Sequence, residues 1–298
     1  MSGRIPRVNA SQVTPVPFAQ RNGKEDFNAS GVAQVGVGRF VFTDNNDPGA
    51  LFELVVDPTG NQSEPIARRP LTGLPRHVLS DPEGLARLDV DGEIVLVVAS
   101  SLAVKKKTGH DGLVRVRYRP EGDLTAEAMP GFRDWLLRQY PELAKAAGRA
   151  ADKGGLNIEG IAWDPGNSTL LFGVRSPVDE AGIPVLRVQL DARAPWTVDA
   201  LSRSESSHLT KHQAGQGIRD LTHDPVEGGF LVLLGRSVSG DDVPFQLCRW
   251  DGVSTSVDVQ AELPQRMKPE GVSVIQGEGP RRVLVVGDTG SFASLHLS

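Results

Sequence analysis

The stretch NIEGIAWDPGNSTLLFGVRS, residues 157–176, contains the pattern that decides the fold. A six-residue phrase, NIEGIA, is followed by a turn, DPGNS, and then by an apolar run. Runs rich in Val, Leu and Phe and bounded by Gly, Pro, Asp and Asn are typical of β-strands rather than helices. The stretch therefore predicts two antiparallel strands joined by a tight turn.

The same phrase returns along the chain. Its copies are NASGVA at 28–33, DPEGLA at 81–86, NIEGIA at 157–162, IRDLTH at 218–223 and KPEGVS at 268–273. Their third residues are Ser30, Glu83, Glu159, Asp220 and Glu270, which lie 53, 76, 61 and 50 positions apart. Sets of about four strands repeated at such a period indicate the blades of a β-propeller. We therefore predict an all-β, five-bladed β-propeller in one domain, residues 1–298.

The longest interval contains an insertion, FRDWLLRQYPELAKAAGRAADKGG. Its apolar side chains recur near helical spacing, which predicts one inserted helix at about 131–152 within an insertion at 131–154. These side chains are Trp135, Leu136, Leu137, Tyr140, Leu143 and Ala147. They can dock either on the propeller itself or on a partner protein.

The last repeat stops after its third strand, so the N-terminal segment, residues 1–27, is expected to supply the missing outer strand and close the ring. Either IPRVNAS or QVTPVPF can do so, and Pro15 and Pro17 suit an outermost strand. The alternative is an open arrangement of six units, in which residues 1–25 form a partial blade.

The net charge, the apolar runs and the cysteine count indicate which kinds of partner and cellular location the protein has. The net charge of −5 argues against nucleic acid, which requires many basic contacts. No apolar run approaches the length of a membrane span, and the N-terminus lacks the apolar region of a secretory signal. The single cysteine, Cys248, excludes an internal disulfide and fits a reducing compartment. We expect a cytoplasmic protein whose partner is a small anionic or polar molecule.

Polar residues are expected to meet at one end of the ring. Adjacent strands are antiparallel, so the start of each innermost strand and the end of the second strand lie at the same end. The acidic and amide candidates there are Asp44, Asn45, Glu83, Glu159, Asp220, Glu270 and Asp288, and the basic ones are Arg175, Arg219, Arg236 and Lys268. The sequence therefore predicts a polar cavity at this end.

Clustered carboxylates raise one another's pKa unless cations intervene, and two kinds of cation are possible. In one alternative Ca²⁺ or Mg²⁺ is bound by oxygen ligands, namely Glu83, Glu159, Glu270, Asp44, Asn45 and Asp288. In the other, the arginines and Lys268 pair with the acids in a structural network that holds the blades together. The glycines after three of the acids, Gly84, Gly160 and Gly271, are explained by crowding of strands near the axis.

Several of these segments resemble a known family. DPEGLA, NIEGIAWDP and KPEGV, with LLFGVRSPV and VLVVGDTGS, are similar to a bacterial β-propeller family of unknown function that resembles the phytase-like and esterase-like propellers. The likeness covers roughly residues 28–298. For phytase-like relatives it implies Ca²⁺-assisted phosphoester hydrolysis, with acidic ligands at the top of the channel. Only Glu83, Glu159 and Glu270 match the Glu-Gly phrase, while Asp220 matches in part and Ser30 does not.

The leading hypothesis is a small-ligand-binding propeller that acts as a metal-assisted hydrolase of an ester or phosphoester. The acids would hold the metal and polarise a water, and the catalytic residues would be Glu159, Asp220 and His110, of which His110 would transfer protons. The residues expected to bind the negative charge of the substrate are Arg175, Arg219, Arg236 and Lys268. The alternative is a non-catalytic interaction scaffold that contacts a partner through the 131–152 helix.

Overall fold

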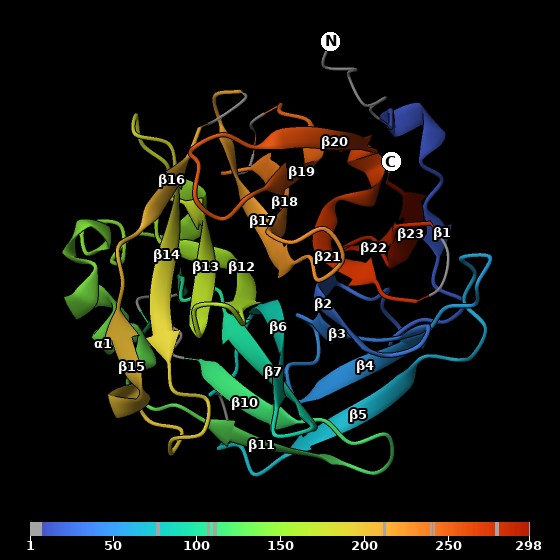
Figure 1. Ribbon diagram of the computed structural model, residues 1–298, viewed down its shortest axis with the longest axis horizontal. Coiled ribbons are helices and arrows are strands. Elements are labelled where there is room, and N and C mark those ends of the chain that lie inside the picture. Colours follow the sequence, from blue (N-terminus) through green and yellow to red (C-terminus); the bar gives the residue numbers. More distant parts are fainter. Residues whose placement is uncertain are drawn as a thin grey trace.

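The computed structural model describes residues 8–75, 78–105, 108–109, 112–210, 213–238, 240, 242–277 and 280–297. Over these ranges the chain is almost entirely β, with one α-helix, α1 (Phe132–Gln139). Figure 1 shows the sheets standing around a common centre, each with one strand near the centre and others toward the periphery. This is a propeller-type arrangement, as the repeated phrase predicts. None of the helices in these ranges has the length and apolarity needed to cross a membrane.

The first two repeats share one eight-stranded sheet, because their outer strands β5 and β11 pair in parallel. The first repeat consists of β2 (Ala29–Gly36), β3 (Arg39–Asp44), β4 (Ala50–Val55) and β5 (Ala67–Thr72). The second consists of β6 (Pro82–Val90), β7 (Glu93–Ser100), β10 (Leu113–Arg117) and β11 (Leu124–Ala128), and a short hairpin, β8 (Val104–Lys105) and β9 (Thr108–Gly109), follows β7. In both repeats the phrase lies at the start of the innermost strand, β2 or β6.

The third and fourth repeats form separate sheets. The third comprises β12 (Asn157–Asp164), β13 (Thr169–Ser176) and β14 (Ile183–Leu190), and both β15 (Leu201–Arg203) and β16 (Ser207–Leu209) pair with β14. The fourth comprises β17 (Gln216–His223), β18 (Phe230–Arg236), β19 (Phe245–Trp250) and β20 (Asp258–Leu263). Short 3-10 helices lie at Ala10–Gln12, Pro141–Leu143, Ala151–Lys153, Val198–Ala200 and Gln265–Met267.

The last sheet combines both ends of the chain. Three strands follow the fifth phrase, β21 (Pro269–Ile275), β22 (Arg282–Gly287) and β23 (Ser291–His296), and the outer strand is the N-terminal β1 (Val16–Pro17). β1 belongs to QVTPVPF, and its Val16 lies opposite Phe292 of β23 in antiparallel pairing. The other candidate stretch is also used, since Val8 forms a parallel bridge with Ala261 at the edge of the neighbouring sheet.

Glycines allow the innermost strands to pack backbone against backbone. A Cβ atom on Gly84 of β6 would lie 2.8 Å from the carbonyl oxygen of Glu159 in β12. One on Gly271 of β21 would lie 2.4 Å from the carbonyl oxygen of Ser30 in β2. Both distances are too short for a side chain, so close approach explains these glycines.

The junction between β17 and β21 uses a carboxylate where the others use glycine. The backbone N–H of Val272 donates to Oδ2 of the fully buried Asp220 over 2.7 Å. Contacts between innermost strands run in the order β2, β6, β12, β17, β21 and back to β2. Asp220 therefore joins two neighbouring sheets.

The inserted helix is shorter than the predicted 131–152. α1 ends at Gln139, and the 3-10 helix Pro141–Leu143 follows it. Proline has no N–H to continue the helical ladder, and its ring disfavours the helical conformation of the preceding residue, Tyr140. The helical spacing of the apolar residues therefore continues beyond the helix itself.

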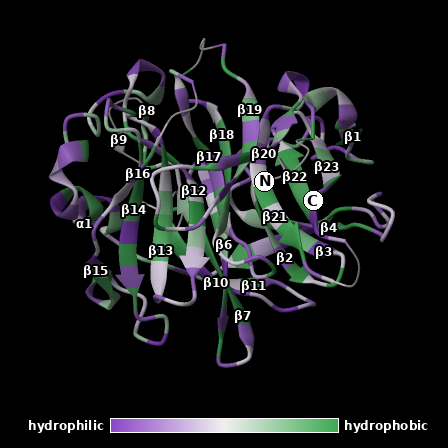
Figure 2. Cartoon of the chain, turned by 45° about the horizontal axis from the view of Figure 1, so that its top comes forward, coloured by the Kyte–Doolittle hydropathy of each residue, from purple (hydrophilic) through white to green (hydrophobic). Residues whose placement is uncertain are grey.

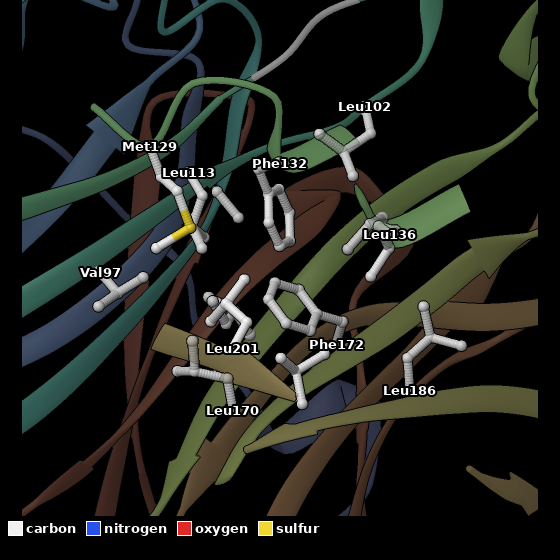
Figure 3. Packing of buried hydrophobic residues seen from close by; sticks show 14 of the residues in the cluster. Val97, Leu102, Leu113, Met129, Phe132, Leu136, Leu170, Phe172, Leu186 and Leu201 are labelled. Carbon is white, nitrogen blue, oxygen red and sulfur yellow. The ribbon is translucent and has the colours of Figure 1, made fainter. Parts of the chain in front are cut away.

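The apolar side of α1 packs on the molecule's own sheets. Figure 3 shows Phe132 and Leu136 of α1 in one cluster with Phe172 of β13 and Leu186 of β14. The rings of Phe132 and Phe172 lie 5.5 Å apart, and Trp135 is also buried. Figure 2 shows hydrophobic residues along the strands and hydrophilic ones in many loops. Of the two alternatives for these apolar side chains, the structure has them packed on the chain's own sheets.

Candidate ligand-binding site at one end of the channel

A β-bulge near the start of each innermost strand decides which side chain is presented to the channel. In β6, Pro82 pairs with Ser100 and Gly84 pairs with Ala99, which leaves Glu83 between them without a partner in the ladder. Such a bulge re-aims the side chain of the extra residue. The residues in this position are Glu83, Glu159, Arg219 and Glu270, and the corresponding irregularity of β2 contains Ser30.

The fourth repeat departs from the sequence-based register by one residue. Ile218 pairs with Leu234 and Asp220 with Leu233, so Arg219 occupies the bulge and Asp220 takes the place of glycine in the other repeats. The phrase IRDLTH lacks the Glu-Gly pair that fixes the alignment of the other phrases. The sequence therefore places Asp220 with the glutamates, whereas the structure places Arg219 there. The prediction that Asp220 is a catalytic acid is not supported by its placement, because its carboxylate binds the backbone of β21.

A cavity of about 400 Å³ lies where these bulges meet. The residues that line it are Asn28, Ser30, Asn45, Glu83, Glu159, Arg175, Arg219, Arg236, Gly240, Phe245, Gln265, Lys268, Glu270 and Asp288. Nine of the predicted site residues are among them, whereas Asp44 and Asp220 are not. His110 lies outside the described residues. The predicted residues do not include Asn28, Phe245 and Gln265, because Asn28 is the first and not the third residue of its phrase, and the other two lie outside the phrases.

Two arginines pair with two carboxylates at the centre of the site. Oε1 of Glu159 accepts from Nη1 of Arg175 over 2.6 Å, and its Oε2 lies 3.0 Å from Nε of Arg219. Nη2 of Arg219 donates to Oε1 of Glu270, and Asn157 donates to Glu159 as well. Burial lowers the pKa of Arg219 to about 10, although the charge of Glu159 opposes this shift. These contacts tie β12, β17 and β21 together.

Glu83 has a different environment. Its carboxyl accepts from Oγ of Ser30 over 3.0 Å and from Nδ2 of Asn45 over 3.1 Å. Among the described residues it has no salt bridge within 4.0 Å to a basic side chain. Burial raises the pKa of Glu83 well above its usual range, and the charges of Glu159 and Asp81 add to the shift. Ionisation of Glu83 is therefore less favourable than that of an exposed glutamate.

Arg236 is another basic side chain that lines the cavity. Its Nη2 donates to Oε1 of Gln265 over 3.2 Å, and no described carboxylate forms an ion pair with it. Its Nε is buried and has no hydrogen-bond partner in this part of the chain. Lys268 lies 3.2 Å from Oδ2 of Asp288, but its side chain is 60% exposed. Arg236 is thus a cation with spare donors on the cavity wall.

Asp44 organises a turn instead of the cavity. It is fully buried, and its oxygens accept from Nδ2 of Asn22 over 2.9 Å and from the backbone N–H of Asn46 over 2.9 Å. The backbone N–H of Asn28 also donates to it over 3.3 Å. Its oxygens are therefore occupied by the chain itself.

The residues present do not fit Ca²⁺ or Mg²⁺. Glu159 and Glu270 are paired with guanidinium groups, and these groups leave few oxygens for an ion that requires six or more. Within the described ranges no three His, Cys, Asp or Glu side chains are grouped to hold a metal ion. The geometry at Glu159 and Glu270 is that of the salt-bridge network.

The other end of the channel also has a cavity, of about 250 Å³. Its arginine, Arg87, donates to Asp89 over 2.7 Å and to the carbonyl oxygen of Gln34 over 2.8 Å. Because its cation already has a carboxylate partner, this end is a weaker candidate for a polar ligand.

Comparison with known proteins supports the fold. No protein-family model matches this chain, and no curated protein matches it. Among solved structures, it is similar to the Malassezia sympodialis allergen Mala s 1, with a TM-score of 0.52, 10% identity and 95% of each chain covered. It is also similar to a thermostable family-43 glycoside hydrolase, with a TM-score of 0.51, 10% identity and coverage of 90% of this chain and 88% of the other. At such low identity these likenesses establish a propeller-type fold and nothing more.

Proposed function

We propose that this protein binds a small anionic molecule, bearing a carboxylate or phosphate group, in the 400 Å³ cavity. The main supporting observation is Arg236, a cavity-lining guanidinium that forms no ion pair with a carboxylate among the described residues. A guanidinium presents a planar fork of donors that matches the two oxygens of a carboxylate or phosphate. A ligand of that class would satisfy the donors that the chain leaves unused.

The charge balance of the cavity supports an anion. The basic side chains that line it are Arg175, Arg219, Arg236 and Lys268, and the acidic ones are Glu83, Glu159, Glu270 and Asp288. The two sets are equal in number, and the raised pKa of Glu83 makes its negative charge the least favourable of the four. Arg236, which has no carboxylate partner among the described residues, is therefore the cation available to an anion.

The remaining polar atoms favour a ligand that also has hydroxyl groups. The lining also contains neutral polar side chains, namely Asn28, Ser30, Asn45 and Gln265. Amide and hydroxyl groups can exchange hydrogen bonds with hydroxyl groups of a ligand. We therefore propose small hydroxy acids or phosphorylated polyols as the ligand class.

Calorimetric titration and thermal-shift measurements test this proposal with malate, glycerate and inorganic phosphate as probes. A hydrogen bond to a charged group contributes about 1.5–3 kcal/mol, so Arg236→Gln should weaken binding by about 10- to 100-fold. Arg193→Gln is a matched control, because Arg193 is an exposed arginine paired with Asp91. Equal binding by both variants, or no binding of any probe to the unaltered protein, would refute the proposal.

Hydrolysis of an ester or phosphoester is a second candidate function. Glu83 supports it, since a buried carboxyl with a raised pKa can donate a proton to a leaving group. No metal-dependent step is included, because the residues do not fit a divalent ion. Glu83→Gln should abolish hydrolysis of nitrophenyl esters or phosphates while anion binding persists. Unchanged hydrolysis by this variant would exclude Glu83 as the proton donor.

We further propose that the repeats count as five blades and that β1 closes the ring. The pairing of β1 with β23 and the circular order of contacts among the innermost strands support this count. Removal of residues 1–18 should then lower the melting temperature markedly. An unchanged melting temperature would favour the open, six-unit alternative. The single cysteine, Cys248, supports the proposed cytoplasmic location.

A further inference from the structure

We infer that Arg219 takes the place of the divalent cation that the phytase-like resemblance implies, so that this site is held together by the chain's own cation. The inference concerns the acidic centre of the cavity and does not depend on anion binding at Arg236.

Arg219 occupies the position at which three other innermost strands present glutamate. The β-bulges of β6, β12 and β21 contain Glu83, Glu159 and Glu270, and the bulge of β17 contains Arg219. A channel with four acids at these positions would need an external cation. Exchange of one acid for arginine both removes a negative charge and adds a positive one.

The guanidinium of Arg219 lies between carboxylates from both neighbouring sheets. It is paired with Glu159 of β12 and Glu270 of β21, and its side chain is only 7% exposed. The charges of Glu83 and Asp288 also favour its charged form. Arg219 therefore supplies a positive charge that is shared by carboxylates from the two neighbouring sheets.

Arg175 completes the charge balance. It donates to the same carboxylate, Glu159, and its Nε donates to the carbonyl oxygen of Arg236 over 3.0 Å. Together, Arg175 and Arg219 bring two positive charges to Glu159 and Glu270, which equals the charge of one divalent ion. Arginine is suited to this position because its fork can bind two carboxylates in fixed geometry.

Thermal unfolding of the full chain with EDTA, CaCl₂ or MgCl₂ tests the inference. We expect the melting temperature of the unaltered protein to be the same in all three. Arg219→Ala should lower it in EDTA, since Glu159 and Glu270 lose a counter-charge, and Ca²⁺ should restore part of the loss by binding the released carboxylates. Arg193→Ala removes an exposed ion pair with Asp91, so its melting temperature should equal that of the unaltered protein in EDTA and should not rise with Ca²⁺.

A double variant keeps the test decisive if Arg219→Ala does not fold in EDTA. Arg219→Ala combined with Glu270→Gln removes one positive and one negative charge, so we expect this double variant to fold. Ca²⁺ should raise its melting temperature less than it raises that of the single variant. Three results would overturn the inference: stabilisation of the unaltered protein by Ca²⁺ or Mg²⁺, an Arg219→Ala variant as stable as the unaltered protein, or an Arg219→Ala variant that Ca²⁺ does not stabilise. Because no anion is titrated, these results are independent of the outcome at Arg236.

Discussion

Glu159→Gln is the substitution that tests the salt-bridge network most directly. The side chain of Glu159 is 2% exposed and accepts from Arg175 over 2.6 Å, while Nε of Arg219 lies 3.0 Å away. Glutamine has nearly the same shape, so the cavity keeps its volume and only the charge is lost. Removal of one partner from a buried ion pair costs about 3–5 kcal/mol, because the other charge stays buried without compensation.

The expected effect is large enough for a calorimetric measurement. At about 2 °C per kcal/mol for a domain of this size, Glu159→Gln should lower the melting temperature by about 6–10 °C. Glu93→Gln provides the control, since Glu93 and its partner Arg117 are 52% and 50% exposed and such pairs contribute little. If the two variants melt within about 1 °C of each other, the network does not stabilise the fold and the reasoning is wrong.

Three further predictions concern single residues. The pKa of Glu83 is raised from its ordinary 4.5, so the contribution of this group to the stability of the folded protein should fall as the pH rises above about 4.5. Glu83→Gln should remove that contribution and so reduce the pH dependence in denaturant titrations at several pH values. A steeper pH dependence in the variant would contradict this. Asp220→Asn should be tolerated because it keeps an acceptor for the N–H of Val272, whereas Asp220→Ala should cost about 1–3 kcal/mol of unfolding free energy. Equal stabilities of these two variants would show that the hydrogen bond does not matter. Gly271→Ala should destabilise by about 1–3 kcal/mol through a clash with the backbone of β2, and Gly277→Ala, which has open space, should have little effect on the urea midpoint.

Much of the architecture could be predicted from the sequence because its signals are local. The apolar runs, the turns between them and the return of one phrase indicated a nearly all-β propeller-type chain with one inserted helix, and the structure confirms this level of description. The length of the helix was overestimated, since the apolar spacing continued past Pro141. The two candidate N-terminal stretches could not be distinguished by their composition, and both pair with other strands.

The sequence by itself determined that acids and bases gather at one end of the channel, because strand alternation and antiparallel pairing follow from local pattern. Only the tertiary structure decided which of them form pairs. Arg219 faces Glu159 and Glu270 because it occupies the bulge of β17, the position that the glutamates occupy in the other strands. Glu83 accepts hydrogen bonds from the neutral side chains of Ser30 and Asn45, which belong to the first repeat, whereas Glu159 is paired with arginines. The pKa of a side chain and its ion pairs depend on residues that are far away in the sequence, so a six-residue phrase cannot predict them.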